Sequence, residues 1–194
     1  NGYFTSAFIL GTLWALILWV LVWVCEEPLL RLFGANDALM PLCKEYMVAP
    51  KLTVPVYVFI NLLSSFLRND GDPGRATKAV IFGGIFNVFG DYFFVFTLDM
   101  GIKGAGIATA MGASMSVLVM LTHFISKKNT LKFVKPLRIL NSFKMISVNG
   151  FSSFIVDVAM GIATMLFNRR VMEYLGTDAL AVYGVIVVVG TLVQ

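Results

Sequence analysis

The composition of this chain is typical of an integral membrane protein. Of its 194 residues, 58% are hydrophobic and only 13% are charged, and the mean hydropathy is +0.84. Soluble domains carry about twice this share of charged residues, so the composition argues against a soluble globular fold. The net charge of +4 arises largely from one segment without aromatic side chains arranged for stacking, and nucleic acid is therefore not expected as a partner.

Six apolar runs, separated by short charged intervals, follow one another along the chain. The first run has 21 residues without a charge, and at about 1.5 Å per residue it covers the roughly 30 Å hydrocarbon layer of a bilayer. The last run has 16 residues, fewer than the ~20 that a membrane span needs. The pattern predicts an all-α, polytopic transmembrane helical bundle with about five complete membrane helices and a sixth cut short, and we expect an internal piece of a longer membrane protein. The runs are 4–24, 52–67, 79–98, 105–126, 146–167 and 179–194.

The charges between the runs predict the orientation in the cell membrane. The segment 127–144 contains lysine and arginine but no acidic residue, and positively charged loops are retained in the cytoplasm. The first loop, 25–45, has more acidic than basic residues and is expected outside. We therefore predict a multi-pass protein of the cell membrane with 127–144 in the cytoplasm. Arg169 and Arg170 then fall on the outer side, against the rule.

The third run contains the sequence FNVFGDYF, which places Asn87 and Asp91 among apolar residues. A carboxylate in the middle of a bilayer costs on the order of 3 kcal/mol, so it is retained where a partner or a function offsets the cost. Asn87 and Asp91 are four residues apart and share one face of a helix, about 6 Å apart along its axis. The pair predicts a cation or proton site, because its oxygens can ligate Na⁺ and the carboxyl can carry a proton. A structural clamp between helices is the alternative.

Other polar residues within or beside the runs are weaker candidates. Asp157, in the fifth run, is equally compatible with a functional and a structural role. His123 lies at the end of the fourth run, where an interfacial histidine is expected, and Lys51 is expected to reach the outer headgroups. Cys25 and Cys43 in the first loop could form a disulfide or serve as small apolar fillers.

Enzyme chemistry is poorly provided for in this chain. It has one histidine and two cysteines, without the CxxC or HExxH spacing that marks common metal sites. We expect neither an enzyme nor a bound cofactor, which leaves transport, scaffold or assembly roles.

Several elements of the chain resemble the MATE (multidrug and toxic compound extrusion) transporters. The segment 66–112, FLRNDGDPGRATKAVIFGGIFNVFGDYFFVFTLDMGIKGAGIATAMG, contains in order a polar turn similar to RxDGxP, an N-x-x-x-D stretch and a G-x-x-G-A-x-x-A-T start. The segment KEYMVAP resembles the start of the family's fourth helix, and 149–184 resembles its seventh helix running into the eighth. The resemblance covers the whole chain, as roughly the third to the early eighth helices of a twelve-helix, two-lobe fold.

This resemblance implies three parts. Residues 1–126 correspond to the end of the amino-terminal lobe, helices three to six of the family fold. Residues 127–144 are the basic cytoplasmic linker. Residues 145–194 begin the carboxy-terminal lobe, with helix seven and a truncated helix eight.

The resemblance also implies a function and a site. MATE proteins are antiporters that expel organic, often cationic, compounds in exchange for Na⁺ or H⁺, so the implied partners are small organic molecules, the lipid bilayer and the remainder of the same transporter chain. The family's helix-five Asn and Asp match Asn87 and Asp91, its helix-six Thr matches Thr109, and a helix-four aromatic hydroxyl matches Tyr46. Na⁺ would bind at Asp91, Asn87 and Thr109. Asp157 lies in helix seven, but about one turn earlier than the functional acid of some relatives, so that its role as a second-lobe polar site stays open.

Two alternatives to drug export are compatible with the sequence. A lipid or polysaccharide-precursor flippase of the same superfamily would be expected to line its cavity with cationic residues, and the runs offer almost none beyond Lys51. A non-transporting membrane assembly subunit would use Asn87 and Asp91 as a helix clamp. A drug-efflux assay separates the three.

Overall fold

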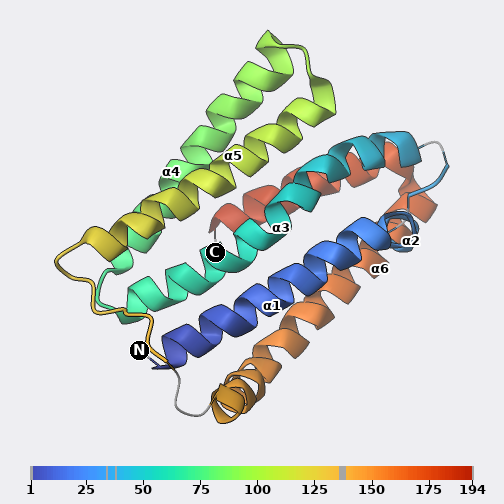
Figure 1. Cartoon of the computed structure of the whole chain (residues 1–194). Coiled ribbons are helices and arrows are strands. Elements are labelled where there is room, and N and C mark those ends of the chain that lie inside the picture. The colour runs from blue at the N-terminus through green and yellow to red at the C-terminus, as the bar shows by residue number, and fades with distance from the viewer. Residues whose placement is uncertain (1, 34, 38, 136–138, 194) are drawn as a thin grey trace.

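The chain folds into helices only, over the part that the structure describes (Figure 1). A computed structural model describes residues 2–33, 35–37, 39–135 and 139–193. Helix α6 is divided by Gly176, whose φ of 80° is incompatible with a continuous helix. The elements are α1 (Gly2–Val24), α2 (Glu26–Leu32), α3 (Met40–Asn69), α4 (Pro73–Asp91), the π-helical turn Tyr92–Thr97, α5 (Gly101–Leu121), the 3-10 turn Thr122–Ile125 and α6 (Ile139–Val193).

Five helices within the described residues are long and apolar enough to cross a membrane, which confirms the predicted all-α membrane architecture. Two further details of the helices come from the structure. The first loop contains the short helix α2. In addition, Pro50 and Pro55 lie inside α3 and not at a helix end. The membrane-length segments are Gly2–Val24, Met40–Asn69, Pro73–Thr97, Gly101–Ile125 and Ile139–Gly176.

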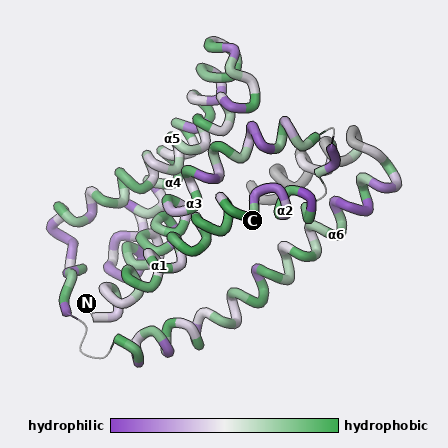
Figure 2. The backbone as a smooth tube through the Cα atoms, turned by 45° about the vertical axis from the view of Figure 1, so that its right-hand side comes forward, coloured by the Kyte–Doolittle hydropathy of each residue, from purple (hydrophilic) through white to green (hydrophobic). Residues whose placement is uncertain are grey.

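The helices do not pack simply in the order of the chain. Helices α4 and α5 form an antiparallel hairpin, and α5 packs along α3 (Figure 1). Helix α1 packs between α3 and α6. In Figure 2, hydrophobic residues predominate along the helices. Because most large apolar side chains on these helices are exposed, the outer surface is suited to lipid and not to water.

Small residues bring α3, α4 and α5 together. A Cβ atom added to Gly83 on α4 would lie 2.6 Å from the carbonyl oxygen of Gly112 on α5, and one added to Gly106 would lie 2.7 Å from the Cβ of Ala49 on α3. Both distances are too short for a side chain, so glycine permits a close approach of the backbones, as is common between membrane helices. The approach places the polar residues of α4 against α5.

The most deeply buried apolar cluster lies at the end of the bundle where α3, α4 and α5 meet the polar turn. Its members are Leu63, Leu67, Ala76, Ala79 and Met120. In the adjacent turn RNDGDPG, Gly71 adopts a φ of 78° that favours glycine. This end of the bundle is therefore well anchored.

Candidate functional site

Asn87 and Thr109, two of the residues predicted to form a cation site, face each other across the α4–α5 contact. Asn87 Nδ2 donates a hydrogen bond of 3.4 Å to Thr109 Oγ1, and the Thr109 hydroxyl donates to the carbonyl oxygen of Ala105 at 3.0 Å. Both side chains are partly buried. Their approach follows from Gly112, where an added Cβ would lie 2.9 Å from the Cβ of Asn87.

Asp91 is the last residue of α4, one helical turn after Asn87. Its Oδ1 atom is buried and accepts no hydrogen bond from any residue that the structure describes. The chain changes from α-helix to the π-helical turn Tyr92–Thr97 directly after it, a geometry that is frequent at functional sites. A buried carboxylate oxygen without a donor is costly and rare, and a bound proton or cation would satisfy it.

The side chains near Asp91 offer oxygen atoms as potential ligands. Among the described residues, no group of three or more histidine, cysteine, aspartate or glutamate side chains is placed to hold a metal ion. Asp91 would supply one carboxylate, and Asn87 and Thr109 amide and hydroxyl oxygens. Oxygen ligands of this kind suit hard cations.

The two remaining predicted site residues lie apart from this group. Tyr46 is on α3 with 46% of its surface exposed, and its hydroxyl makes no hydrogen bond with Asp91 among the described contacts. Asp157 is exposed on α6, whose main packing partner is α1. The structure thus pairs Asn87 with Thr109, positions Asp91 one turn away, and does not bring Tyr46 or Asp157 into contact with them.

An apolar groove of about 520 Å³ lies between α3 and α5. Its volume is in the range of pockets for small organic ligands. Phe86 and Ala110, the sequence neighbours of Asn87 and Thr109, contribute to its wall. Side chains that line it include Leu52, Thr53, Phe86, Met111, Met115 and Leu118.

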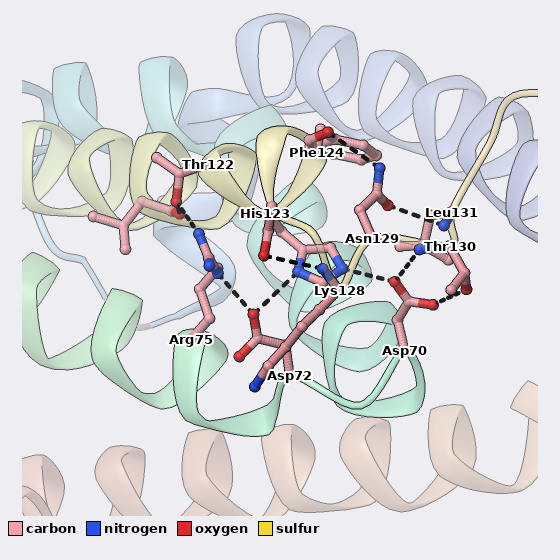
Figure 3. A network of polar contacts seen from close by, with 12 residues as sticks. Asp70, Asp72, Arg75, Thr122, His123, Phe124, Lys128, Asn129, Thr130 and Leu131 are labelled. Atoms are coloured by element: carbon pink, nitrogen blue, oxygen red, sulfur yellow. Dashed lines mark hydrogen bonds and ion pairs between the residues drawn. The ribbon is translucent and has the colours of Figure 1, made fainter.

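A second polar cluster, which sequence reasoning missed, lies at the end of α5 (Figure 3). His123 was expected at a membrane interface, but its side chain is fully buried. Its Nε2 lies 2.7 Å from Asp70 Oδ2, and its Nδ1 lies 3.2 Å from Asp72 Oδ2. The spacing of the two aspartates in RNDGDPG was the available signal, because a buried histidine needs partners on both ring nitrogens.

Additional donors complete this cluster, which we call the turn cluster (Asp70, Asp72 and His123). Asp70 accepts hydrogen bonds from the Thr130 backbone N–H at 2.9 Å and from the Thr130 hydroxyl. Asp72 accepts one from Arg75 Nε at 2.8 Å. The α3–α4 turn is thereby tied both to the end of α5 and to the segment that follows it.

These contacts shift the pKa values of both aspartates in the same direction. Burial alone would raise the pKa of Asp70, but the hydrogen bonds from Thr130 and His123 outweigh it and hold the pKa below its ordinary value. The hydrogen bond from Arg75 is the main cause that lowers the pKa of Asp72, against the opposing effect of burial. Both groups are therefore carboxylates at neutral pH.

Lys51 also differs from expectation, and the structure decides between the two alternatives for the cysteines of the first loop. Lys51 does not extend freely toward the headgroups: its Nζ lies 2.6 Å from Glu26 Oε2 and 4.7 Å from the centre of the Trp23 ring. Its side chain is only 12% exposed. Cys25 and Cys43 are free thiols, so that of the two alternatives a disulfide is not formed.

Five membrane-length helices with a partly buried carboxylate inside one of them define a multi-pass membrane protein. The model of the MatE family matches residues 2–93. The chain is 24% identical over 190 residues to the multidrug export protein MepA of Staphylococcus saprophyticus, covering 94% of this chain and 41% of that protein. The corresponding values for MepA of Staphylococcus aureus (strain bovine RF122 / ET3-1) are 23% over 166 residues, 82% and 36%. The chain thus spans about two fifths of the length of the curated relatives that it matches.

Solved structures agree with this assignment. A multidrug resistance MATE family transporter of the MOP superfamily in an inward-facing conformation superposes with a TM-score of 0.78 at 25% identity, over 90% of this chain and 40% of that one. A MOP superfamily transporter from Pyrococcus furiosus, described as having a binding pocket of reverse polarity, gives 0.77 at 24% identity, over 98% and 44%. The chain is similar to MATE transporters in sequence and in fold, which confirms the predicted resemblance. Its relatives are transporters, in agreement with the prediction that it is not an enzyme.

Proposed function

We propose that the full-length protein exports organic compounds in exchange for Na⁺ or H⁺, with Asp91 as the site of the coupling ion. The observation that carries this proposal is the buried Oδ1 of Asp91 without a hydrogen-bond donor, one turn from the Asn87–Thr109 pair. Relatives that are described as multidrug export proteins support the export of small organic molecules. Residues 1–126 and 145–194 belong to two lobes in this proposal, joined by the linker 127–144.

The chemistry of coupling follows from the state of one carboxyl group. An empty Asp91 is a carboxylate in an apolar setting, which is costly. A proton converts it into a neutral group that can donate a hydrogen bond, whereas Na⁺ would recruit the oxygens of Asn87 and Thr109. Either ion changes the packing preference of α4 against α5. Since α5 also forms the apolar groove, loading Asp91 lowers the affinity for the organic compound, and this differential affinity is what drives exchange.

The cleanest test replaces Asp91 by asparagine in the full-length protein. Asp91→Asn retains size and removes both the charge and the titratable proton, so we expect normal insertion and loss of gradient-driven efflux. Efflux is measured in everted vesicles under imposed Na⁺ and pH gradients at matched protein levels. Asp157→Asn is the matched control, and we expect it to retain more efflux than Asp91→Asn. Wild-type efflux by Asp91→Asn, or equal loss in both variants, would refute the proposal.

The same assay separates drug export from the two alternative functions. A helix clamp in an assembly subunit predicts that Asp91→Asn reduces the amount of protein first, while any surviving protein behaves normally. A flippase of the superfamily predicts no drug efflux in the wild type. Lys103 is the one charged residue among the described residues that line the groove, so the groove lacks the several cationic side chains that a flippase for anionic lipid precursors would be expected to use.

The proposed orientation places the linker 127–144 in the cytoplasm. We expect a cysteine introduced at Lys135, in a variant that lacks Cys25 and Cys43, to be protected from an impermeant thiol reagent in intact cells. A parallel sample retains Cys25 and Cys43. Cys25 and Cys43 lie in the loop proposed to face outward and serve as the accessible reference. Labelling of residue 135 from outside would show that the topology is the reverse of the one proposed.

A further inference from the structure

A second cavity, of about 610 Å³, lies between the α3–α4 turn, the start of α4 and the end of α5. Its polar part differs from the apolar groove, because three basic side chains line it: Arg75 and Lys78 from α4 and Lys128 from the segment after α5. We call it the basic cavity. It is separate from the Asp91 site, and it does not require the proposed transport activity.

The basic side chains are unequally engaged. Arg75 is held in place, with Nε 2.8 Å from Asp72 Oδ2 and Nη1 2.7 Å from Thr122 Oγ1 (Figure 3). Lys78 and Lys128 are exposed, and neither lies within ion-pair distance of a carboxylate among the described residues. Asp72 is the one acidic residue in the described lining, so the cavity has an excess of positive charge.

Asp70 does not neutralise the excess positive charge of the basic cavity. Its carboxylate accepts hydrogen bonds from both His123 and Thr130, and it does not line the cavity. The charged and titratable groups around the site are therefore Arg75, Lys78 and Lys128 on one side and Asp72 on the other, with His123 buried between the two aspartates. A ligand that enters meets an oriented guanidinium and two lysine ammonium groups that form no close ion pair among the described residues, although Lys128 is near enough to Asp72 to contribute to its lowered pKa.

The opposite wall of the cavity is apolar and continues along the membrane surface of α4. Phe82 and Val119 form this wall. Residues Lys78, Phe82 and Phe89 are spaced by four and seven positions, so they follow one face of the helix. Phe82 is 48% exposed and Phe89 71% exposed. A strip of exposed phenylalanine thus leads away from the basic groups.

We propose that the basic cavity binds the phosphate of an anionic phospholipid, whose acyl chain lies along Phe82 and Phe89. Phosphate is recognised by guanidinium and ammonium groups, and basic pockets between membrane helices are suited to acidic headgroups. A free phosphate would use the same cations, but it would not need the adjoining apolar strip. The geometry therefore points to a lipid with one negatively charged phosphodiester.

Lipid binding to the full-length protein in detergent tests this assignment. Phosphatidylglycerol and phosphatidylcholine are titrated separately, and bound lipid is counted by native mass spectrometry. We expect preferential binding of phosphatidylglycerol, weakened roughly fivefold by Lys78→Gln or Lys128→Gln, since a basic residue near an anionic headgroup contributes about 1 kcal/mol. The double variant should lose roughly 25-fold, by addition of the two effects.

Two controls separate the cavity from general surface charge. Lys127 is exposed next to Lys128 but does not line the cavity, so Lys127→Gln should bind phosphatidylglycerol like the wild type. The double variant Lys78→Arg with Lys128→Arg retains the charge and should retain binding. Unchanged binding in the double glutamine variant, or equal loss in Lys127→Gln, would overturn the proposal. Competition by millimolar inorganic phosphate without any preference for phosphatidylglycerol would assign the cavity to a soluble phosphate and would also overturn it.

Discussion

The turn cluster and the Asp91 site differ in how completely their carboxylates are satisfied. In the turn cluster, Asp70 and Asp72 lie within hydrogen-bond distance of the two ring nitrogens of His123. Both also accept hydrogen bonds from further donors. Within the membrane-length part of α4, by contrast, the Oδ1 of Asp91 is buried without a donor among the described residues. A satisfied buried network rigidifies the structure, whereas an unsatisfied group is costly unless something binds to it.

Buried acidic residues near the two ends of the α4–α5 hairpin can therefore have different roles, one in stability and one in ion coupling. The turn cluster joins three segments that are distant in sequence, the α3–α4 turn, the end of α5 and the residues around Thr130. Asp91 joins nothing in the described structure. Damage to the first cluster should therefore appear as lost stability, and damage to the second as lost coupling at normal stability.

The largest effect on stability is expected from His123→Ala. The change removes a fully buried side chain that contacts both aspartates and leaves two carboxylates with fewer donors, which costs about 3 kcal/mol. We expect a clearly lower melting temperature of the full-length protein in detergent. Asp91→Asn is the matched comparison, and its melting temperature should equal or slightly exceed that of the wild type. The reverse ranking would contradict this assignment, because Asp91 would then contribute more to stability than His123.

A smaller loss of stability is expected from Gly83→Ala, which disturbs only the α4–α5 contact near Asn87. The added methyl group would lie 2.6 Å from the Gly112 carbonyl oxygen, and overpacking of this kind costs about 1–3 kcal/mol. Gly84→Ala is the control on the same helix, because nothing lies within 4 Å of its added Cβ. We expect Gly83→Ala to lower both melting temperature and efflux, and Gly84→Ala to change neither. Equal behaviour of the two variants would mean that this close contact does not matter.

The helical architecture could be predicted from the sequence because length and apolarity decide whether a segment can span a membrane. The charge-free run 4–24 is a direct example, since it falls within α1. The interior position of Pro50 and Pro55 could not be predicted with the same rule. Proline usually ends a helix in water, but neighbouring helices can satisfy the freed carbonyl groups in a membrane protein.

The candidate site was predictable only in part. The four-residue spacing of Asn87 and Asp91 places them on one helix face, but the partner of Asn87 on α5 required either the family resemblance or the structure. The turn cluster shows the limit more clearly. Asp70 and His123 are 53 positions apart, and no periodicity relates them, because their contact depends on how α4 and α5 fold back on each other.

The turn cluster should also respond to acid. Both of its aspartates have a pKa lowered in the folded protein, so they bind fewer protons there than in the unfolded chain. Their contribution to stability is therefore fully present above the unfolded pKa of about 4. It is lost as the pH falls through the lower pKa of the folded state. We expect the melting temperature to decline below roughly pH 4, less steeply in Asp70→Asn than in the wild type. Identical pH profiles of the melting temperature in Asp70→Asn and the wild type would show that Asp70 does not contribute to the acid response.

The smallest effect is expected from Asn87→Ala, which tests whether Asp91 acts with a partner. The change removes the 3.4 Å hydrogen bond to Thr109 and an amide oxygen that could ligate Na⁺, but it retains the carboxylate. A single neutral hydrogen bond or ligand of this kind contributes about 1 kcal/mol, which corresponds to roughly a fivefold weaker affinity for the coupling ion. We therefore expect efflux to persist at a high ion gradient and to fall at a low one, in contrast to Asp91→Asn, which should fail at both. Thr109→Val is the companion variant, because it removes the other side of the same contact while keeping the shape of the side chain. If Asn87→Ala abolishes efflux at every gradient, the charge on Asp91 is insufficient by itself. If it has no effect at any gradient, Asp91 binds its ion without Asn87, and the pair is reduced to a contact between helices.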